Sequence, residues 1–310
     1  MTVLVTGADG FVGRWLVEHL RREGDDVVTA CGQDLGTDDC TTRIDIRDPA
    51  DAQRVVDWAR PASIYHLAAV AFGPDAQRNP TDALDVTVGG TLNLLRAAAR
   101  LGNPPTVFIP SSGEVYGRPT TTRVLTEEDP IAPVSAYGSA KAAQELVALA
   151  CHHAGALPVV VARAFNHIGP GQRDAFVVAS FASQLAAIAL GRNEPRLRVG
   201  NLLPERDFTD VRDVVAAYRL LVVGGHAGTV FNVASGAGVS IGLLLDRLVE
   251  LSGVEATIEV DQDRVRQVDP PHIVGDASRL RAATGWRPRH SLDQTLRDVW
   301  EDALARASVA

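Results

Sequence analysis

The stretch Val3-Leu4-Val5-Thr6-Gly7-Ala8-Asp9-Gly10-Phe11-Val12-Gly13 decides the fold of this chain. A short apolar run predicts a buried strand, and three glycines at a spacing of three residues follow it directly. An apolar stripe that continues through Trp15, Leu16 and Leu20 then predicts a helix. Glycines in a strand–turn–helix let the backbone approach a pyrophosphate, and the helix N-terminus attracts its negative charge. The stretch therefore predicts a dinucleotide-binding turn.

A second motif, Tyr137-Gly138-Ser139-Ala140-Lys141, opens an apolar segment that runs through Leu149 and predicts a helix. Residues at i and i+4 lie on one helix face, a turn apart. A cation at that place favours the phenolate, so we expect Lys141 to lower the pKa of Tyr137. A positioned tyrosine can pass a proton to or from a substrate oxygen, which is worth roughly 10² to 10⁴ in rate. An ordinary surface tyrosine and lysine could have the same spacing.

Apolar strands alternate with predicted helices along most of the chain. The expected strands are 3–5, 27–30, 44–46, 64–69, 106–110, 159–163 and 231–234. Alternating strands and helices require right-handed crossovers, which predicts an α/β fold: a Rossmann-type doubly wound parallel sheet with a smaller C-terminal α/β substrate lobe. We expect residues 1–165, joined by about 209–235, to form the cofactor domain. Residues 166–208 and 236–310 would form the substrate lobe, with 165–172 irregular because of its Gly and Pro residues.

Three ordered motifs resemble the extended short-chain dehydrogenase/reductase family: the glycine turn, Ser111-Ser112-Gly113-Glu114-Val115-Tyr116-Gly117, and the Tyr137–Lys141 segment. That family contains nucleotide-sugar epimerases, dehydratases and reductases. The stretches 198–202 and 206–213 are similar to its GDP-sugar branch, especially the GDP-6-deoxy-4-keto-mannose reductases and their dehydratase relatives. The resemblance implies NAD(P) as cofactor and a nucleotide-diphosphate sugar as substrate.

The resemblance also implies four catalytic residues. Ser112 would hydrogen-bond the reacting oxygen of the substrate beside Tyr137, and Lys141 would hold the nicotinamide ribose. Glu114 stands where sugar 4,6-dehydratases place a base. The deoxythymidine-sugar dehydratases have Asp before that glutamate, and this chain has Gly113. The GDP-mannose dehydratases carry the glutamate without that Asp, so Glu114 does not settle the reaction. A carboxylate that only tethers a loop is the alternative.

Cofactor contacts are expected at both ends of the dinucleotide. The second strand runs into Cys31-Gly32-Gln33 without the acid that usually meets the ribose hydroxyls, and Arg14 could reach a 2′-phosphate, so NADP is favoured over NAD. Family members often place an acid such as Asp45 near the adenine. The expected cofactor contacts are Gly7, Gly10, Phe11, Val12, Gly13, Arg14, Asp45, Ile46, Leu67, Ala68, Ala69, Tyr137 and Lys141.

Substrate contacts follow from the same resemblance. They are Ser112, Asn166, Asn201, Arg206, Arg266 and Asp269, of which Asp269 shortens a family glutamate. Arginine suits a diphosphate because its planar fork donates paired hydrogen bonds. For Arg206, an ion pair with Asp207 or Asp210 is the alternative. Thr87 replaces a family asparagine, and we expect His66 to be a core histidine rather than a catalyst.

Composition excludes several classes of protein. The net charge of −8 argues against nucleic acid as a partner, and no apolar run of about 18 residues predicts a membrane span. The first strand begins too early for a signal peptide. Three scattered cysteines predict reduced thiols in a cytoplasmic protein, and eight histidines without ligand spacing imply no metal. The resemblance implies a homodimer formed through helices of the cofactor half.

The predicted function is NAD(P)H-dependent reduction of the C4 ketone of a nucleotide-linked 4-keto-6-deoxyhexose, with GDP favoured as the nucleotide. One alternative is a GDP-mannose-type 4,6-dehydratase, although those enzymes commonly read Gly-Gln-Asp-Gly where this chain has Ala8-Asp9-Gly10. A nucleotide-sugar C4 epimerase is another. An NAD(P)-sensing protein on the same fold is the non-enzyme alternative, and such proteins typically lose the Tyr/Lys pair that this chain keeps.

Overall fold

The computed structural model describes residues 1–32, 40–119, 123–265 and 269–309. Its largest sheet is built from β1 (Thr2–Thr6), β2 (Asp26–Cys31), β3 (Thr42–Arg43), β4 (Ser63–His66), β5 (Thr106–Ser112), β6 (Val159–Ala164) and β10 (Val230–Val233). All neighbouring strands are parallel, in the order β10-β6-β5-β4-β1-β2-β3. The order reverses between β1 and β4, which is the doubly wound Rossmann arrangement that the sequence predicted. Ligands in such sheets bind outside the carboxyl ends of the strands.

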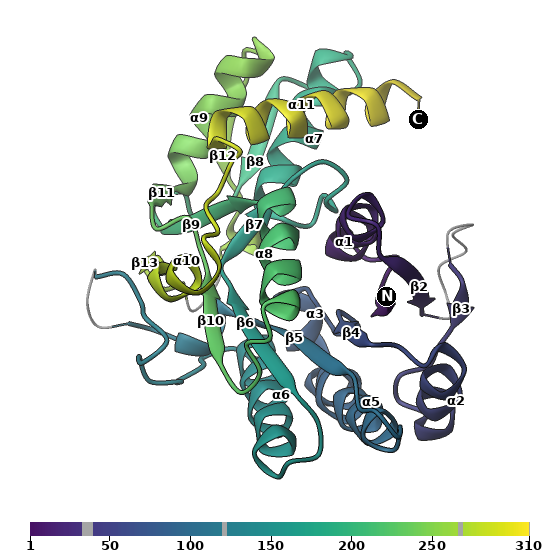
Figure 1. Ribbon diagram of the computed structural model, residues 1–310. Helices are drawn as coiled ribbons and strands as arrows, with labels where there is room; N and C mark the ends of the chain where they lie inside the picture. Colours follow the sequence, from purple (N-terminus) through teal and green to yellow (C-terminus); the bar gives the residue numbers. More distant parts are fainter. Residues whose placement is uncertain (33–39, 120–122, 266–268, 310) are drawn as a thin grey trace.

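Helices cover both faces of this sheet (Figure 1). They are α1 (Phe11–Arg22), α2 (Pro49–Ala59), α3 (Gly73–Arg78), α4 (Pro80–Leu84), the π-helical turn η1 (Asp85–Gly89), α5 (Gly90–Ala99), α6 (Ala136–His153) and α8 (Val211–Val223). Side chains alternate along a strand, so Val3 and Val5 join the core under α1 and α8. Leu4 between them joins the opposite core, under α2, α5 and α6.

A second lobe carries its own core and its own sheets. Its elements are β7 (Asn166–Ile168), α7 (Val177–Ala189), β8 (Arg196–Val199), β9 (Glu205–Asp210), β11 (Gly238–Ser240), α9 (Ile241–Ser252), β12 (Thr257–Val260), η3 (Gln262–Arg264), β13 (His272–Ile273) and α11 (Leu292–Val309). Helix α10 (Ser278–Thr284) packs instead against β10 and α8, with Leu280 in the core of the large sheet. Strand β9 pairs with β7, β11 and β13, and β12 pairs with β8. Strand β10 returns to the large sheet, where it pairs with β6, as expected. The domain ranges given above remain our proposal.

Two local expectations were wrong. The segment 166–168 was expected to be irregular, but Asn166–Ile168 pairs in parallel with Phe208–Asp210, because β9 offers it a free edge. The strand expected at 44–46 ends earlier, at Arg43. There the Asp45 N–H donates to the Asp51 carboxylate at 2.7 Å instead of to a neighbouring strand. Asp48 then caps α2, with Pro49 in the first turn, as predicted.

The cysteine prediction was also wrong for one pair. Cys31 and Cys40 form a disulfide, and among the described residues Cys151 is the free thiol. The chain before β3 lies beside β2, where Thr41 hydrogen-bonds Thr29, and the two cysteine Cα atoms are 6.1 Å apart. In the part of the chain that the structure describes, no helix has both the length and the apolar character needed to cross a bilayer.

A buried ion pair fixes helix α6 to the sheet. Arg163 on β6 donates from Nε to the Glu145 carboxylate at 3.1 Å and from its terminal nitrogen at 2.5 Å, and both side chains are at most 5% exposed. The same guanidinium donates to the Tyr116 hydroxyl at 3.0 Å. Helix α6 carries Tyr137 and Lys141, so this pair holds the helix on which the site depends.

Removing the charge of Glu145 should destabilise the fold. We expect Glu145→Gln to lower the free energy of unfolding by about 3 kcal/mol, because it leaves a buried guanidinium without its counter-ion. Denaturant unfolding measures the change. The matched control is Glu301→Gln at an exposed position of α11, for which we expect less than about 0.5 kcal/mol. Equal losses in the two variants would contradict the role given to the pair.

Candidate functional site

The glycine turn at the end of β1 is built around backbone contacts that exclude a side chain. Gly7 has φ +68°, and a Cβ there would lie 2.8 Å from the Ala68 nitrogen. A Cβ on Gly13 would lie 2.2 Å from the Gly7 carbonyl oxygen. Glycine is therefore required at both positions, by the left-handed backbone at the first and by close packing at the second.

Helix α1 begins at this turn with its N-terminus open to an anion. Gly10 caps the helix without a side-chain hydrogen bond, and no acidic residue lies in the first turn. The first N–H groups of a helix lack intrahelical partners and attract phosphate. The side chains of Phe11 and Val12 pack against the core, so a cofactor contact from either would come from the backbone. The turn thus fits a dinucleotide pyrophosphate.

The side chains expected near the adenosine have other partners in this structure. Arg14 donates to the Gly171 carbonyl at 3.2 Å, in the second lobe. The Asp45 carboxylate accepts from the Arg47 backbone N–H and Nε, each at 3.0 Å, which lowers the pKa of Asp45. The Ile46 side chain is buried in the core against Gly90. Their cofactor contacts, including that of Arg14 with a 2′-phosphate, stay predictions.

The residues that follow β4 lie next to the glycine turn. The strand ends at His66, earlier than the expected 64–69, and Leu67, Ala68 and Ala69 follow it as a half-buried segment. The Leu67 N–H donates to the Thr6 carbonyl at 3.1 Å, and the Ala68 N–H donates to the Thr6 hydroxyl at 3.3 Å. Leu67 and Ala68 therefore lie beside the turn, and the cofactor contacts of all three residues stay predictions.

Ser112, Tyr137 and Lys141 come together at the end of β5. Ser112 is the last residue of that strand, and its hydroxyl is hydrogen-bonded to Tyr137 in the first turn of α6. One turn further on, the Lys141 ammonium donates to the Pro110 carbonyl of β5 at 2.8 Å and to Gln144 Oε1 at 2.9 Å. The structure thus assembles the hydroxyl, the phenol and the ammonium where the sequence placed them.

The prediction that Lys141 lowers the pKa of Tyr137 was wrong. Burial raises the pKa of Tyr137, and the nearby Glu114 carboxylate raises it further, while the hydrogen bond with Ser112 acts in the opposite direction. The ammonium donates to Pro110 and Gln144, and its burial lowers the pKa of Lys141 to about 7. Tyr137 is therefore a neutral phenol, which suits a proton donor.

Glu114 lies in the 3₁₀ turn η2 (Gly113–Tyr116), directly after Ser112 and Gly113. Its carboxylate accepts from the Ser135 hydroxyl at 2.9 Å. That hydroxyl also accepts from the Gly138 N–H at 3.0 Å and so caps α6. The contact matches the tethering alternative, and a catalytic role for Glu114 stays a prediction.

Predicted substrate residues gather in the second lobe. Arg206 on β9 forms an ion pair with Asp269, and Asn201 donates to the same carboxylate at 3.4 Å. The alternative pairing of Arg206 was wrong, because Asp207 accepts from Ser235 and neighbouring backbone N–H groups and Asp210 from Arg212. Asn166 is exposed on β7, in the same sheet. Arg266 lies outside the described residues.

Sequence reasoning assigned no role to His167, which the structure places between the lobes. Its ring stacks on Phe11 of the glycine turn, with ring centroids 6.2 Å apart and planes within 5°. Burial lowers the pKa of His167, so the ring is neutral. The only signal in the sequence was its position next to Asn166. Thr87, in place of the family asparagine, accepts from the Val70 N–H at 3.4 Å.

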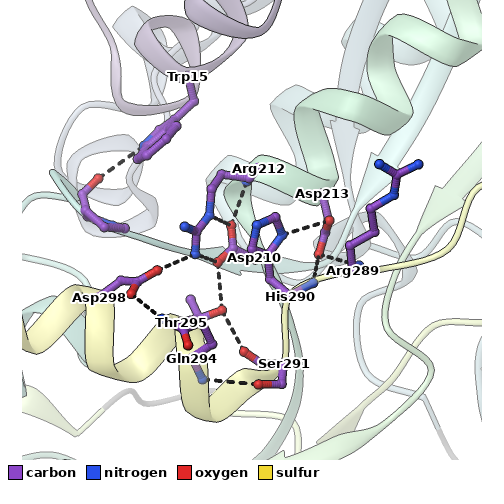
Figure 2. A network of polar contacts seen from close by, with 11 residues as sticks. Trp15, Asp210, Arg212, Asp213, Arg289, His290, Ser291, Gln294, Thr295 and Asp298 are labelled. Atoms are coloured by element: carbon purple, nitrogen blue, oxygen red, sulfur yellow. Dashed lines mark hydrogen bonds and ion pairs between the residues drawn. The ribbon is translucent and has the colours of Figure 1, made fainter.

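A polar network joins the second lobe to helix α1 (Figure 2). Trp15 donates to the Pro170 carbonyl at 3.1 Å. Arg212 at the start of α8 pairs with Asp210 and with Asp298 of α11, each at 2.6 Å. The Arg212 guanidinium also lies 5.9 Å from the centre of the Trp15 ring, so α1, α8 and α11 meet at this network.

Known proteins resemble this chain over nearly its whole length. A family model described as GDP-mannose 4,6 dehydratase matches residues 4–299. GDP-6-deoxy-D-mannose reductase from Pseudomonas aeruginosa is 36% identical over 306 residues, 98% of this chain and 97% of that protein. GDP-6-deoxy-D-talose 4-dehydrogenase from Aggregatibacter actinomycetemcomitans is 29% identical over 318 residues, all of both chains.

Solved structures give the same result. The structure of RMD from Pseudomonas aeruginosa complexed with NADPH has a TM-score of 0.88 and 35% identity, and the match covers 98% of this chain and 99% of that one. UDP-glucose 4-epimerase from Thermus thermophilus in complex with NAD has a TM-score of 0.87 and 28% identity, with 98% and 99% covered.

Proposed function

This chain belongs to the GDP-mannose 4,6 dehydratase family, and from that premise we propose that it reduces the C4 ketone of a GDP-linked 4-keto-6-deoxyhexose with NADPH. The observation that carries the proposal is the neutral Tyr137 phenol, hydrogen-bonded to Ser112 at the carboxyl end of the sheet. An acid that stays protonated at neutral pH suits the reductive direction, in which a developing alkoxide has to be protonated.

The residues of the chain have separate roles in this reaction. Ser112 donates a hydrogen bond to the C4 oxygen, and Tyr137 gives that oxygen its proton. Lys141 holds the nicotinamide ribose. A bound NADPH supplies the hydride to C4. Hydrogen-bond donors fixed in advance where charge develops supply much of such catalysis.

The cofactor proposal is supported by the glycine turn and by the second strand. The turn is closed tightly enough that neither Gly7 nor Gly13 has space for a Cβ, as expected for a glycine turn that lets its backbone approach a pyrophosphate. Strand β2 ends at Cys31 and is followed by Gly32, without the acid that would repel a 2′-phosphate. The structural neighbour from Pseudomonas aeruginosa is itself complexed with NADPH.

The substrate proposal is supported by the Asn201–Arg206–Asp269 cluster. Arg206 is only 8% exposed and already pairs with Asp269, so its guanidinium is held in place before a ligand arrives. A guanidinium can share its donors between a carboxylate and a diphosphate oxygen. Two of the relatives named above act on GDP-sugars by their names, which favours GDP as the nucleotide.

A GDP-mannose-type 4,6-dehydratase is the second candidate. One observation favours it: the Glu114 carboxylate lies close enough to Tyr137 to raise the pKa of the phenol. A base at that place would remove a proton from the sugar, and the cofactor would be regenerated in the same site. A C4 epimerase has no such observation in its favour.

Net cofactor use separates these candidates. We expect the purified enzyme to oxidise one NADPH for each GDP-linked 4-keto-6-deoxymannose that it consumes. With GDP-mannose and a catalytic amount of cofactor, we expect no keto-sugar. Keto-sugar formed from GDP-mannose without net NADPH use would show the dehydratase instead. Inactivity in both assays, with NADPH bound, would point to the sensing protein.

The assembly and location are proposed with the function. Leu84 of α4 and Leu146 of α6 are 45% and 58% exposed on helices of the cofactor half, which would cover them in a homodimer. Sedimentation of the purified protein at the mass of a monomer would contradict this. We propose a cytoplasmic location, without nucleic acid or membrane as partners. The Cys31–Cys40 disulfide opposes that location, because disulfides are rare in the cytoplasm.

A further inference from the structure

Buried polar side chains connect Lys141 to the glycine turn. The Lys141 ammonium donates to Gln144 Oε1 at 2.9 Å, and Gln144 Nε2 donates to the Thr91 hydroxyl at 2.8 Å. His66 Nε2 lies 3.0 Å from the same hydroxyl, and His66 Nδ1 lies 2.8 Å from the hydroxyl of Thr6. Lys141 is 5% exposed and the other four are fully buried. Thr6 is the residue directly before Gly7.

Each bond in this network has one possible direction. The Thr91 hydroxyl donates to the Thr87 carbonyl at 2.6 Å, so it accepts from both Gln144 and His66. His66 therefore carries its hydrogen on Nε2, and its Nδ1 accepts from Thr6. Burial, together with the charge of Lys141, lowers the pKa of His66 to about 3, so the ring stays neutral. The amide of Gln144 can then turn only its oxygen toward Lys141.

We propose that Gln144 is a positioning residue that holds the Lys141 ammonium in the cofactor site, with its own orientation set by Thr91 and His66. The inference rests on the proposed function, because it takes NADPH as the ligand that Lys141 meets. A buried ammonium needs acceptors to remain charged. Pro110 supplies one from β5 and Gln144 supplies the other from α6.

The protonation state of Lys141 is sensitive to its neighbours, because its pKa lies near neutral pH. Burial lowers its pKa to about 7, so the ammonium loses its proton near neutral pH. The groups that face it are the Pro110 carbonyl from β5, the Gln144 amide from α6 and, from β4, the neutral His66. Without the Gln144 oxygen, the neutral amine would be reached at lower pH. With a carboxylate in its place, the ammonium would persist to higher pH.

Binding of NADPH, measured by fluorescence titration from about pH 5 to about pH 9, tests this role without any sugar substrate. In the wild type we expect affinity to fall as pH rises through the pKa of Lys141. A hydrogen bond to a charged group is worth about one to two pKa units, so Gln144→Leu should move the midpoint down by about that amount. Gln144→Glu should move it up. The matched control, Gln184→Leu on α7, removes an amide that bonds Ser180 on the same helix and Arg198 on β8, and it should leave the midpoint unchanged.

The outcomes separate the two proposals. Opposite shifts in the leucine and glutamate variants support Gln144 as the positioning residue. Unchanged midpoints in both variants, with melting curves showing folded protein, would overturn that role and leave the proposed function intact. If Gln144→Leu does not fold, Gln144→Glu alone decides: a midpoint that moves to higher pH supports the role of Gln144, and an unchanged midpoint overturns it. A wild type that binds no NADPH at any pH would overturn the proposed function itself, and the role of Gln144 with it.

Discussion

Replacing Tyr137 with phenylalanine should lower kcat by roughly 10² to 10⁴ while NADPH affinity changes by no more than a few-fold. The hydroxyl is the proton donor in the proposed reaction, and its hydrogen bond with Ser112 places it at the end of β5. Phenylalanine keeps the ring and its packing. Steady-state kinetics with the keto-sugar, together with direct titration of NADPH, measures the two quantities separately.

The matched control for this variant is Tyr65→Phe. Tyr65 is 1% exposed in the core beside Phe108, so the change removes a buried tyrosine hydroxyl away from the proposed site. We expect kcat of the control to stay within a few-fold of the wild type. Near-normal turnover in Tyr137→Phe would remove that phenol from the mechanism, and equal losses in both variants would show a general effect of lost packing.

Substituting alanine for Gly13 should weaken NADPH binding by at least about 100-fold, or about 2.7 kcal/mol. The added Cβ would lie 2.2 Å from the Gly7 carbonyl oxygen and 2.7 Å from that of Ala8. Both neighbours are backbone atoms of the turn itself, so the clash can be relieved only by opening the turn. The melting temperature should fall as well, because the turn joins β1 to α1.

Gly102→Ala is the control for the glycine substitution. A Cβ on Gly102 meets no atom within 4 Å, and its φ is not in the left-handed region. We therefore expect unchanged NADPH affinity there. Wild-type affinity in Gly13→Ala would mean that the cofactor does not use this turn.

Local patterns in the sequence predicted the sheet and much of the site. The glycine spacing after Val5 predicted a turn whose packing the structure confirms, since Cβ atoms on Gly7 and Gly13 have no space. The i, i+4 spacing of Tyr137 and Lys141 placed both on one helix face beside β5. Such features depend on residues close in the chain, where backbone geometry decides the outcome.

Contacts between distant residues could not be predicted in the same way. The pKa of Tyr137 depends on its burial and on Glu114, which approaches from another element, so the helix spacing alone predicted the wrong sign. Arg206 pairs with Asp269 rather than with two carboxylates that are nearer in sequence. The partner of Cys31 depends on how the chain before β3 lies against β2. Tertiary packing decides each of these.

The central step of the proposed reaction is hydride transfer from the cofactor to C4 of the sugar. The direct measurement is turnover of GDP-linked 4-keto-6-deoxymannose with NADPH that carries deuterium at the transferable position, followed by NMR of the sugar product. We expect one deuterium at C4 and an equal amount of oxidised cofactor. A product without deuterium, or sugar conversion without net oxidation of NADPH, would contradict the proposed reductase.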